Sequence, residues 1–483
     1  NQIITMTAVS SVSGSYADLY NIYVTNAGQY NGEGDEAVTI TGSVTATQAD
    51  AIADVTSGVV TAASITADTA SALNAALSDA QVNAYTLTIS AGSAVATDLT
   101  SLDSKTSVAV NAAAVTVITG SATEVAAAYA ANPTTGITGL GNENVEITGT
   151  TVATLEELKA INNATSGTIT LNAQSISADY SGLAADVKAA FAGITTQTGK
   201  ITLTDASVSV TDINTVAGVT SGEVTATVTS AAASVLNALT TTSTDAITMT
   251  VNAEAASAAT LAADLVSLNG KTNQIITMTA VSSVSGSYAD LYNIYVTNAG
   301  QYNGEGDEAV TITGSVTATQ ADAIADVTSG VVTAASITAD TASALNAALS
   351  DAQVNAYTLT ISAGSAVATD LTSLDSKTSV AVNAAAVTVI TGSATEVAAA
   401  YAANPTTGIT GLGNENVEIT GTTVATLEEL KAINNATSGT ITLNAQSISA
   451  DYSGSVADVK AAFAGITTQT GKITLTDTSV SVA

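Results

Sequence analysis

Residues 38–58 of the chain read VTITGSVTATQADAIADVTSG. Aliphatic residues first alternate with threonine, which predicts a strand with one buried face. The alanine-rich residues 47–55 predict a short helix, and Thr47 with Asp50 approximates a capping box at its start. In the closing letters TSG, we expect Gly58 to adopt the left-handed conformation that ends a helix. One short repeat therefore reads as strand, turn, helix and stop.

The same order recurs along the chain. Residues 145–167 pass from VEITG through TLEELKAI to TSG, and residues 201–222 pass from ITLT to TSG. Further helix caps are predicted at Ser15 with Asp18, Ser121 with Glu124, and Thr154 with Glu157. We expect about ten short repeats of roughly 27 residues in 272 residues, a size typical of strand-plus-helix solenoids.

The predicted fold class is an α/β repeat solenoid, in which each short repeat adds one or two parallel strands and a short helix. Strands stacked at ~4.8 Å would advance roughly 48 Å in ten short repeats. The alternative is a series of β-sandwich domains of ~100 residues each. The alanine-rich residues 70–77, 124–131 and 184–192 favour helix and argue against sandwiches.

A much longer repeat contains these short ones. Residues 1–211 recur as residues 273–483, and the copies differ at four positions: Leu183/Ser455, Ala184/Val456, Ala206/Thr478 and Thr211/Ala483. The junction, residues 270–275, reads GKTNQI and contains no flexible linker. We predict a first long repeat over residues 1–272 and a second, incomplete copy over residues 273–483, joined as one continuous rod. Because Asn1 is not an initiator methionine, we expect the chain to be part of a longer array.

Composition excludes several classes of function. The formal charge is −32, from 41 acidic and nine basic residues, so no basic face is available for nucleic acid. No apolar run is long enough to span a bilayer. The apolar content of 46% predicts a folded chain, and the absence of Cys and His removes disulfides and imidazole ligands. An acidic surface rich in Thr and Ser favours an extracellular location.

Three sequence segments resemble those of a known family: residues 223–229 (EVTATVT), 234–240 (SVLNALT) and 264–272 (DLVSLNGKT). They resemble the repeats of giant Ala/Thr/Val-rich cell-surface proteins of marine cyanobacteria, including the swimming-motility type. The resemblance covers essentially the whole chain, but it lies in composition and rhythm. It implies an exported, cell-surface or filamentous role, no particular enzyme activity, and no transferable functional residues.

No catalytic residue is predicted. A nucleophile with a histidine base is excluded because the chain has no His. Ser104-Lys105 is interpreted as a solvated turn. Glu156-Glu157 could suggest paired carboxylates, but neighbours on a helix point about 100° apart. Both lie in a first helical turn, where acids favour the helix dipole, so we interpret them as capping residues.

One loop has the chemistry of a metal site. Residues 31–36 read NGEGDE, with flexible glycines between hard oxygen ligands, as Ca²⁺ requires. The spacing matches neither an EF-hand nor the calcium-binding nonapeptide, which favours a plain solvated loop over a metal site. Residues 141–144 (GNEN), with their copy at residues 413–416, are a weaker candidate loop. Ca²⁺ is the one cofactor that the sequence suggests. The candidate ligands are Glu33, Asp35 and Glu36, with their copies Glu305, Asp307 and Glu308.

The tyrosines are concentrated just before this loop. Tyr16, Tyr20 and Tyr23 follow the i, i+4, i+7 spacing of one helix face, and the pattern recurs at Tyr288, Tyr292 and Tyr295. They predict either a cover for the core or a lateral contact surface, because Tyr is favoured at interfaces.

Rows of threonine on predicted strands suggest ice binding as a further functional hypothesis. The pairs are Thr86/Thr88, Thr202/Thr204 and Thr248/Thr250. Threonine is also a favoured polar residue on exposed strands, and short repeats of unequal length would break a strict lattice.

We therefore expect a non-enzymatic structural repeat protein, extracellular or at the cell surface, that self-associates into a filament, fibre, bundle or surface layer. The alternative is an adhesin stalk or Ca²⁺-dependent surface-binding protein, whose partner would be a cell-surface glycan or a neighbouring rod. An ice-binding solenoid is a third alternative, disfavoured by the unequal repeats.

Overall fold

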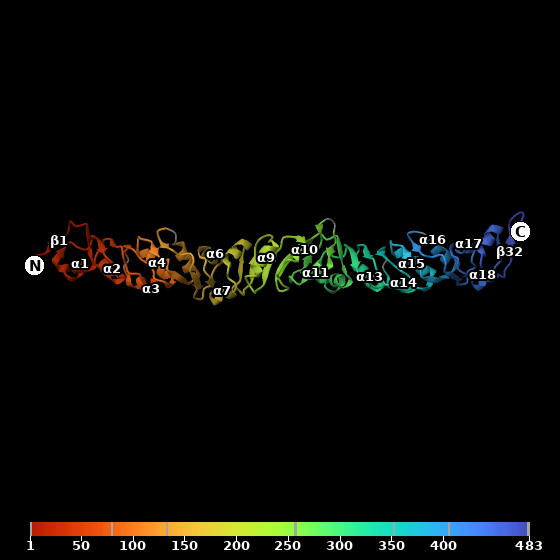
Figure 1. Ribbon diagram of the computed structural model, residues 1–483, viewed down its shortest axis with the longest axis horizontal. Coiled ribbons are helices and arrows are strands. Elements are labelled where there is room, and N and C mark those ends of the chain that lie inside the picture. Colours follow the sequence, from red (N-terminus) through yellow and green to blue (C-terminus); the bar gives the residue numbers. More distant parts are fainter. Residues whose placement is uncertain are drawn as a thin grey trace. The chain divides into compact units, whose positions relative to one another are not determined.

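The computed structural model describes residues 2–78, 81–131, 134–255, 258–350, 353–403 and 406–480. The chain divides into two compact units, Asn1–Thr229 with Leu239–Ile247, and Ser230–Ala238 with Thr248–Ala483. Within each unit, short strands and short helices alternate along the chain (Figure 1), and the strands pair in parallel. This repeat-like α/β arrangement confirms the predicted fold class at that level and is consistent with a solenoid.

The helical and strand segments of the first unit are two to ten residues long. Its helices are α1 (Tyr16–Tyr20), the π-helix η1 (Asn21–Thr25), the 3₁₀ helix η2 (Ala27–Gln29), α2 (Ala46–Ala53), α3 (Ala70–Ala76), α4 (Ala96–Lys105), α5 (Ala122–Ala130), α6 (Leu155–Ala164), α7 (Ala173–Ser177), α8 (Ala184–Ala190) and α9 (Val210–Ala217). Its strands are β1 (Ile4–Thr5), β2 (Ser11–Ser15), β3 (Tyr30–Asn31), β4 (Ala37–Thr41), β5 (Val60–Ala62), β6 (Ala84–Tyr85), β7 (Gly92–Val95), β8 (Val110–Asn111), β9 (Val115–Gly120), β10 (Ile137–Thr138), β11 (Asn144–Ile147), β12 (Ile169–Thr170), β13 (Tyr180–Gly182), β14 (Ile201–Leu203) and β15 (Val224–Thr227).

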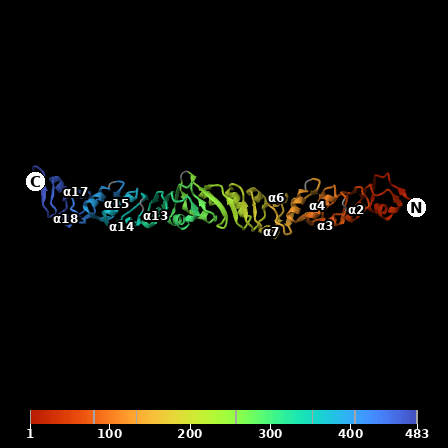
Figure 2. The ribbon, with the colours of Figure 1, turned by 180° about the vertical axis from the view of Figure 1, so that it is seen from behind.

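The second unit repeats this order, and Figure 2 shows α13, α14 and α15 following one another. Its helices are α10 (Ala233–Leu236), α11 (Ala262–Asn269), α12 (Tyr288–Tyr292), η4 (Asn293–Thr297), η5 (Ala299–Gln301), α13 (Ala318–Ala325), α14 (Ala342–Ala348), α15 (Ala368–Lys377), α16 (Ala394–Ala402), α17 (Leu427–Ala436), α18 (Ala445–Ser449) and α19 (Val456–Ala462). Its strands are β16 (Ala231–Ala232), β17 (Ala246–Asn252, which begins in the first unit), β18 (Thr260–Leu261), β19 (Ile276–Thr277), β20 (Ser283–Ser287), β21 (Tyr302–Asn303), β22 (Ala309–Thr313), β23 (Val332–Ala334), β24 (Ala356–Tyr357), β25 (Gly364–Val367), β26 (Val382–Asn383), β27 (Val387–Gly392), β28 (Ile409–Thr410), β29 (Asn416–Ile419), β30 (Ile441–Thr442), β31 (Tyr452–Gly454) and β32 (Ile473–Leu475).

Strand register brings equivalent residues of successive short repeats side by side. Val38 of β4 is paired with Val12 of β2 and with Val60 of β5. These partners are 26 and 22 residues away (38 − 12 and 60 − 38), so the short repeats differ in length. Within β4, burial alternates as the sequence predicts, with Val38 and Ile40 inside and their neighbours exposed. The loops absorb the differences in length while the apolar rows stay aligned.

The core lies between strands and helices and consists mostly of Ala, Val, Leu and Ile side chains, with Tyr85, Tyr357 and Phe191 also fully buried. On α2, Ala49 and Ile52 are fully buried against the strand layer. Neighbouring helices also pack on one another, as α5 does on α6 and α6 on α8. A single short repeat could not bury its apolar face alone, so its stability depends on the repeats on either side.

The helix caps are largely as predicted, with one correction. Ser121 and Thr154 form capping boxes with Glu124 and Glu157, and Ser15 accepts a hydrogen bond from the Asp18 N–H. The predicted box at Thr47 and Asp50 is wrong. Helix α2 starts earlier, after Thr45, whose Oγ1 accepts from the Gln48 N–H at 3.2 Å while Gln48 Oε1 accepts from the Thr45 N–H at 3.0 Å. Asp50 instead is buried and accepts hydrogen bonds from the N–H and Oγ of Ser78, in the next short repeat.

The predicted role of Gly58 is also wrong, for a physical reason that lies in the neighbouring repeat. Its φ is not positive, but a Cβ at this position would lie 2.1 Å from the Glu36 carbonyl oxygen. Thr56 Oγ1 donates to that same oxygen at 2.9 Å and accepts from the Gly58 N–H at 3.0 Å. The Ser57 N–H donates to the Gly34 oxygen at 2.7 Å. The TSG motif therefore fastens one short repeat closely to the backbone of the previous one.

The junction between the long copies lies inside the second unit and has ordinary repeat geometry. Met249 of β17 pairs with Ile276 of β19, and Thr260 of β18 pairs with Val284 of β20. The hydroxyl of Tyr302 donates to the Leu265 oxygen at 3.1 Å. Residues before and after the junction are thus joined by the same parallel pairing that joins neighbours within one copy.

Candidate functional site: the tyrosine and acidic segment

The three predicted tyrosines of each copy do not share one surface. Helix α1 widens into the π-helix η1, where the Asn26 N–H reaches the Asn21 oxygen five residues back at 2.9 Å. The rings of Tyr16 and Tyr20 lie 5.4 Å apart, and Tyr20 is 36% exposed. Tyr23 is only 4% exposed and cannot contribute to a lateral contact.

The second copy separates its tyrosines in the same way. Tyr288 and Tyr292 have their rings 5.4 Å apart, and Tyr292 is 37% exposed. Tyr295 is buried, like Tyr23. The alternative prediction, a cover for the core, therefore describes Tyr23 and Tyr295, and a contact surface could include only the other pair in each copy.

The buried tyrosine is bonded to the acidic loop. The Tyr23 hydroxyl donates to Glu36 Oε2 at 3.3 Å, and the Gly34 N–H donates to the same oxygen at 2.8 Å. Burial, followed by the negative charges of Glu36, Glu33 and Asp35, raises the pKa of Tyr23 far above its ordinary value. The phenol is therefore held as a neutral hydrogen-bond donor.

Tyr295 and Glu308 repeat this arrangement at 3.3 Å, with the Gly306 N–H donating to Glu308 Oε2 at 2.8 Å. Burial also raises the pKa of Glu308, and the backbone hydrogen bonds it accepts oppose that effect only in part.

A second loop, which the sequence suggests only as a weaker metal candidate, has the same arrangement of a tyrosine bonded to a buried glutamate. Residues 139–143 read GLGNE and share the Gly-x-Gly-x-Glu pattern of residues 32–36, GEGDE. The Tyr129 hydroxyl donates to Glu143 Oε1, while the N–H groups of Gly141 and Asn142 donate to Oε2 at 2.8 and 3.1 Å. Tyr401 and Glu415 repeat this in the second copy. The pattern, with a tyrosine 13 or 14 residues before the glutamate, was available in the sequence as a signal.

The six candidate metal ligands are placed differently from one another. Glu36 and Glu308 are 1% exposed, Glu33 and Glu305 are half-buried, and Asp35 and Asp307 are exposed. In the part of the chain that the structure describes, no group of three or more His, Cys, Asp or Glu side chains is arranged so that it could hold a metal ion. Buried carboxylate oxygens without a hydrogen-bond partner nevertheless occur at Glu36 (Oε1), Glu33 (Oε2) and Glu308 (Oε1).

The residues considered for catalysis have structural partners. Lys105 Nζ donates to the Asn74 oxygen at 2.9 Å and to the Leu77 oxygen, at the C-terminal end of α3. Ser104 Oγ donates to the Ser101 oxygen at 2.6 Å. Although burial alone would raise the pKa of Glu157, hydrogen bonds from Thr123 and Thr154 outweigh it and lower that pKa, as expected for a capping carboxylate.

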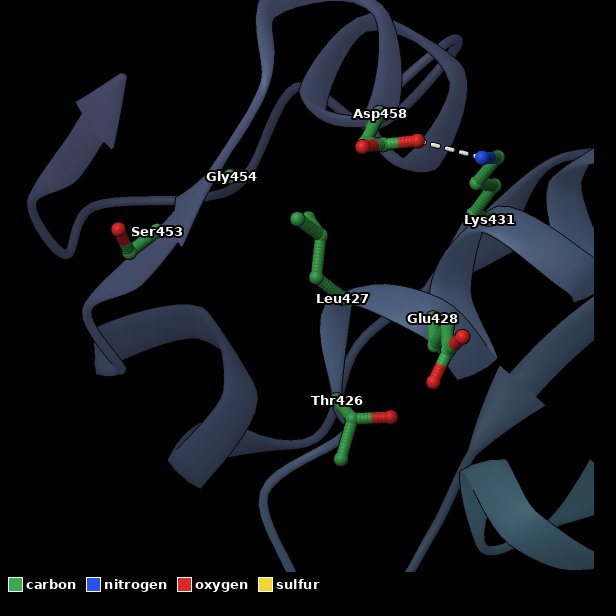
Figure 3. Close-up of a pocket in the computed structure, with 7 residues that line it drawn as sticks. All are labelled: Thr426, Leu427, Glu428, Lys431, Ser453, Gly454 and Asp458. Carbon is green, nitrogen blue, oxygen red and sulfur yellow. Dashed lines mark hydrogen bonds and ion pairs between the residues drawn. The ribbon is translucent and has the colours of Figure 1, made fainter. Parts of the chain in front are cut away.

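One surface hollow lies between α17 and the segment of β31 and α19, with a volume of about 370 Å³. Figure 3 shows Leu427 pointing toward Gly454, and Lys431 paired with Asp458. A Cβ on Gly454 would lie 2.4 Å from Leu427 Cδ2, so a larger residue there would require the Leu427 side chain to move. The equivalent hollow in the first copy measures about 120 Å³ and has the same lysine–aspartate pair, at Lys159 and Asp186.

Threonine rows are present but interrupted. Thr202 pairs with Thr225, and Thr250 pairs with Thr277, but Thr277 pairs next with Asn303. Thr88 likewise pairs with Asn111. The rows are therefore short, as expected for ordinary exposed strand positions.

Within the described residues, no helix has the length and apolar character needed to cross a membrane. Comparisons with protein-family models, with curated proteins and with solved structures find no match to this chain.

Proposed function

We propose that the chain is a non-enzymatic structural protein, a solenoid segment of an extracellular filament, fibre or surface layer. The observation that carries this proposal is the junction of the long copies. Met249 and Thr260 pair with Ile276 and Val284 across it as if no boundary existed. A chain that adds a second copy through its ordinary strand pairing can be extended without limit, which suits a fibre better than a set of independent binding domains.

The distribution of charge sets a condition on how such filaments would associate. Three lysines form ion pairs between successive short repeats of the first copy: Lys159–Asp186, Lys188–Asp212 and Lys200–Glu223. The remaining acidic excess, within a net charge of −32, keeps such chains apart at low ionic strength. Association of filaments side by side would therefore need salt or cations to screen the repulsion.

Electron microscopy of the purified chain tests the proposal. We expect a rod whose features repeat at roughly 50 Å, from ten short repeats at ~4.8 Å each. Separate globules of about 40 Å joined by flexible connections would instead support the sandwich alternative and overturn the proposal. Antibody labelling of intact, unpermeabilised cells tests the extracellular location, and labelling only after permeabilisation would contradict it.

The adhesin stalk remains the second candidate because one exposed apolar stripe recurs once per long copy. It consists of Tyr20 and Val24, 36% and 37% exposed, and of Tyr292 and Val296, 37% and 39% exposed. Replacing both tyrosines by serine should abolish adhesion to a cell-surface glycan or neighbouring rod if the stripe is the contact. Unchanged adhesion would remove this candidate.

A further inference from the structure

The acidic loop, residues 32–36, carries more negative charge than its fold requires. A second loop of the same chain, residues 139–143, shows this by comparison. Loop 139–143 has the same Gly-x-Gly-x-Glu pattern as loop 32–36, and both loops place their two glycines at positive φ. The comparison loop has a leucine and an asparagine where the acidic loop has Glu33 and Asp35. These two carboxylates are therefore not needed to form the loop.

The buried glutamates of the two loops differ in their hydrogen bonds. Both oxygens of Glu143 accept hydrogen bonds, from the Tyr129 hydroxyl and from two backbone N–H groups. In Glu36, only Oε2 accepts hydrogen bonds, and Oε1 has no partner although the side chain is 1% exposed. Glu308 shows the same deficiency in the second copy. A buried carboxylate oxygen without a donor is costly unless something positive compensates it.

The unpartnered oxygen belongs to a carboxyl group that faces the loop. Its other oxygen is held by the Gly34 N–H at 2.8 Å, so the carboxyl lies against the segment that carries Glu33 and Asp35. Glu33 contributes a second buried oxygen without a partner, Oε2. Of the three carboxylates, Glu36 contacts the Tyr23 hydroxyl directly, at 3.3 Å.

We propose that loops 31–36 and 303–308 each bind one hard divalent cation of the Ca²⁺ class, with Glu36 and Glu308 as buried ligands. Glu33 and Glu305 supply the second carboxylate of each site. Main-chain and water oxygens complete the shell, as is common for Ca²⁺, because the described residues include no cluster of three acidic ligands at either loop. The proposal goes beyond the structural function and does not depend on it.

Titration of the full chain with Tb³⁺, a luminescent substitute for Ca²⁺, tests the site. Tyr23 lies 3.3 Å from Glu36 Oε2 and can transfer excitation to a bound ion. We expect tyrosine-sensitised emission that saturates at about two ions per chain, one for each loop, and that added Ca²⁺ displaces. The double substitution Tyr23→Phe and Tyr295→Phe should reduce the emission while calorimetry still detects Ca²⁺ binding.

Loop exchange provides matched variants that should keep the fold. Glu33→Leu with Asp35→Asn, made also at Glu305 and Asp307, gives both acidic loops the residues of loop 139–143, which forms without them. We expect the loop exchange to weaken Ca²⁺ binding by about tenfold or more and to leave the far-ultraviolet circular dichroism spectrum unchanged. Glu36→Gln with Glu308→Gln should abolish binding.

A distant substitution completes the design. Glu143→Gln should leave binding at the two acidic loops unchanged, because both oxygens of Glu143 already accept hydrogen bonds within their own loop. Absence of saturable emission, or equal Ca²⁺ affinity in the loop-exchanged chain, would overturn the proposal. The proposal would also be overturned if the melting temperature changed with pH in the acidic range but not with added Ca²⁺. A proton would then supply the positive charge that compensates the buried carboxylate.

Discussion

Replacing Gly58 by alanine tests directly whether the short repeats are fastened by close backbone contact. A Cβ at this position would lie 2.1 Å from the Glu36 oxygen and 2.3 Å from its carbonyl carbon, whereas ordinary contacts begin at 3.4 Å. The two backbones would have to separate by more than an ångström. That movement would break the hydrogen bonds from Thr56 Oγ1 to the Glu36 oxygen at 2.9 Å and from the Ser57 N–H to the Gly34 oxygen at 2.7 Å.

The expected magnitude follows from these losses. Two hydrogen bonds at about 0.5–1.5 kcal/mol each give about 1–3 kcal/mol, and overpacking typically adds about 1–3 kcal/mol. We therefore expect Gly58→Ala to lower the local free energy of unfolding by about 2–6 kcal/mol. Gly330→Ala should do the same in the second unit, where the Cβ would lie 2.0 Å from the Glu308 oxygen.

Native-state hydrogen exchange on the full chain is the appropriate assay, because it reports opening near the substitution even if distant repeats stay folded. Gly28→Ala is the matched control. A Cβ there meets nothing within 4 Å, and the φ of Gly28 is not positive, so its exchange should be unchanged or slower.

Gly58→Asn separates the two explanations of this glycine. Asparagine tolerates the left-handed conformation, so it would be accepted if Gly58 were only a helix terminator. It carries a Cβ, so close contact predicts that it destabilises as much as alanine. Exchange rates around residue 58 that match the unsubstituted protein in both variants would refute the reasoning.

Four further substitutions, one of them a control, test local features of the first unit. Thr45→Ala should lower the free energy of unfolding by about 1 kcal/mol through loss of the α2 cap, whereas Thr47→Ala should change it by less than about 0.5 kcal/mol; urea denaturation compares them. Tyr129→Phe removes a donor from the buried Glu143 carboxylate and should cost about 1–3 kcal/mol, and an unchanged urea midpoint would contradict this. Because the pKa of Glu157 is lowered from 4.5, its stabilising effect should be full above that pH and disappear as the pH falls below it. Glu157→Gln should therefore lower the melting temperature at pH 7 but not in strong acid.

Local sequence was sufficient for much of the fold. The alternation at Val38 and Ile40 predicted a half-buried strand, and the boxes at Ser121 and Thr154 predicted helix starts, because each depends on atoms a few residues apart. Near-identical residues 1–211 and 273–483 also made a repeated structure the natural expectation. Parallel pairing of successive strands then follows from stacking short repeats in one direction.

Function-related roles were less accessible because they depend on the neighbouring repeat. The helical spacing of Tyr20 and Tyr23 suggested one face, but the π-helix turned Tyr23 inward to Glu36 and left Tyr20 exposed. Three loop carboxylates looked equivalent in the sequence, yet the fold buried Glu36 and left Asp35 in solvent. Such differences arise where a helix of one segment meets a loop of another.

The sequence by itself determined the alternation of strand and helix, the duplication, and the exclusion of histidine and cysteine chemistry, because periodicity and composition are properties of the chain alone. Only the tertiary structure decided that Gly58 is required by the Glu36 backbone and that Glu36 keeps an oxygen without a partner. The requirement for Gly58 depends on how closely successive repeats approach. That distance is set by packing between residues more than twenty positions apart, which no local pattern encodes.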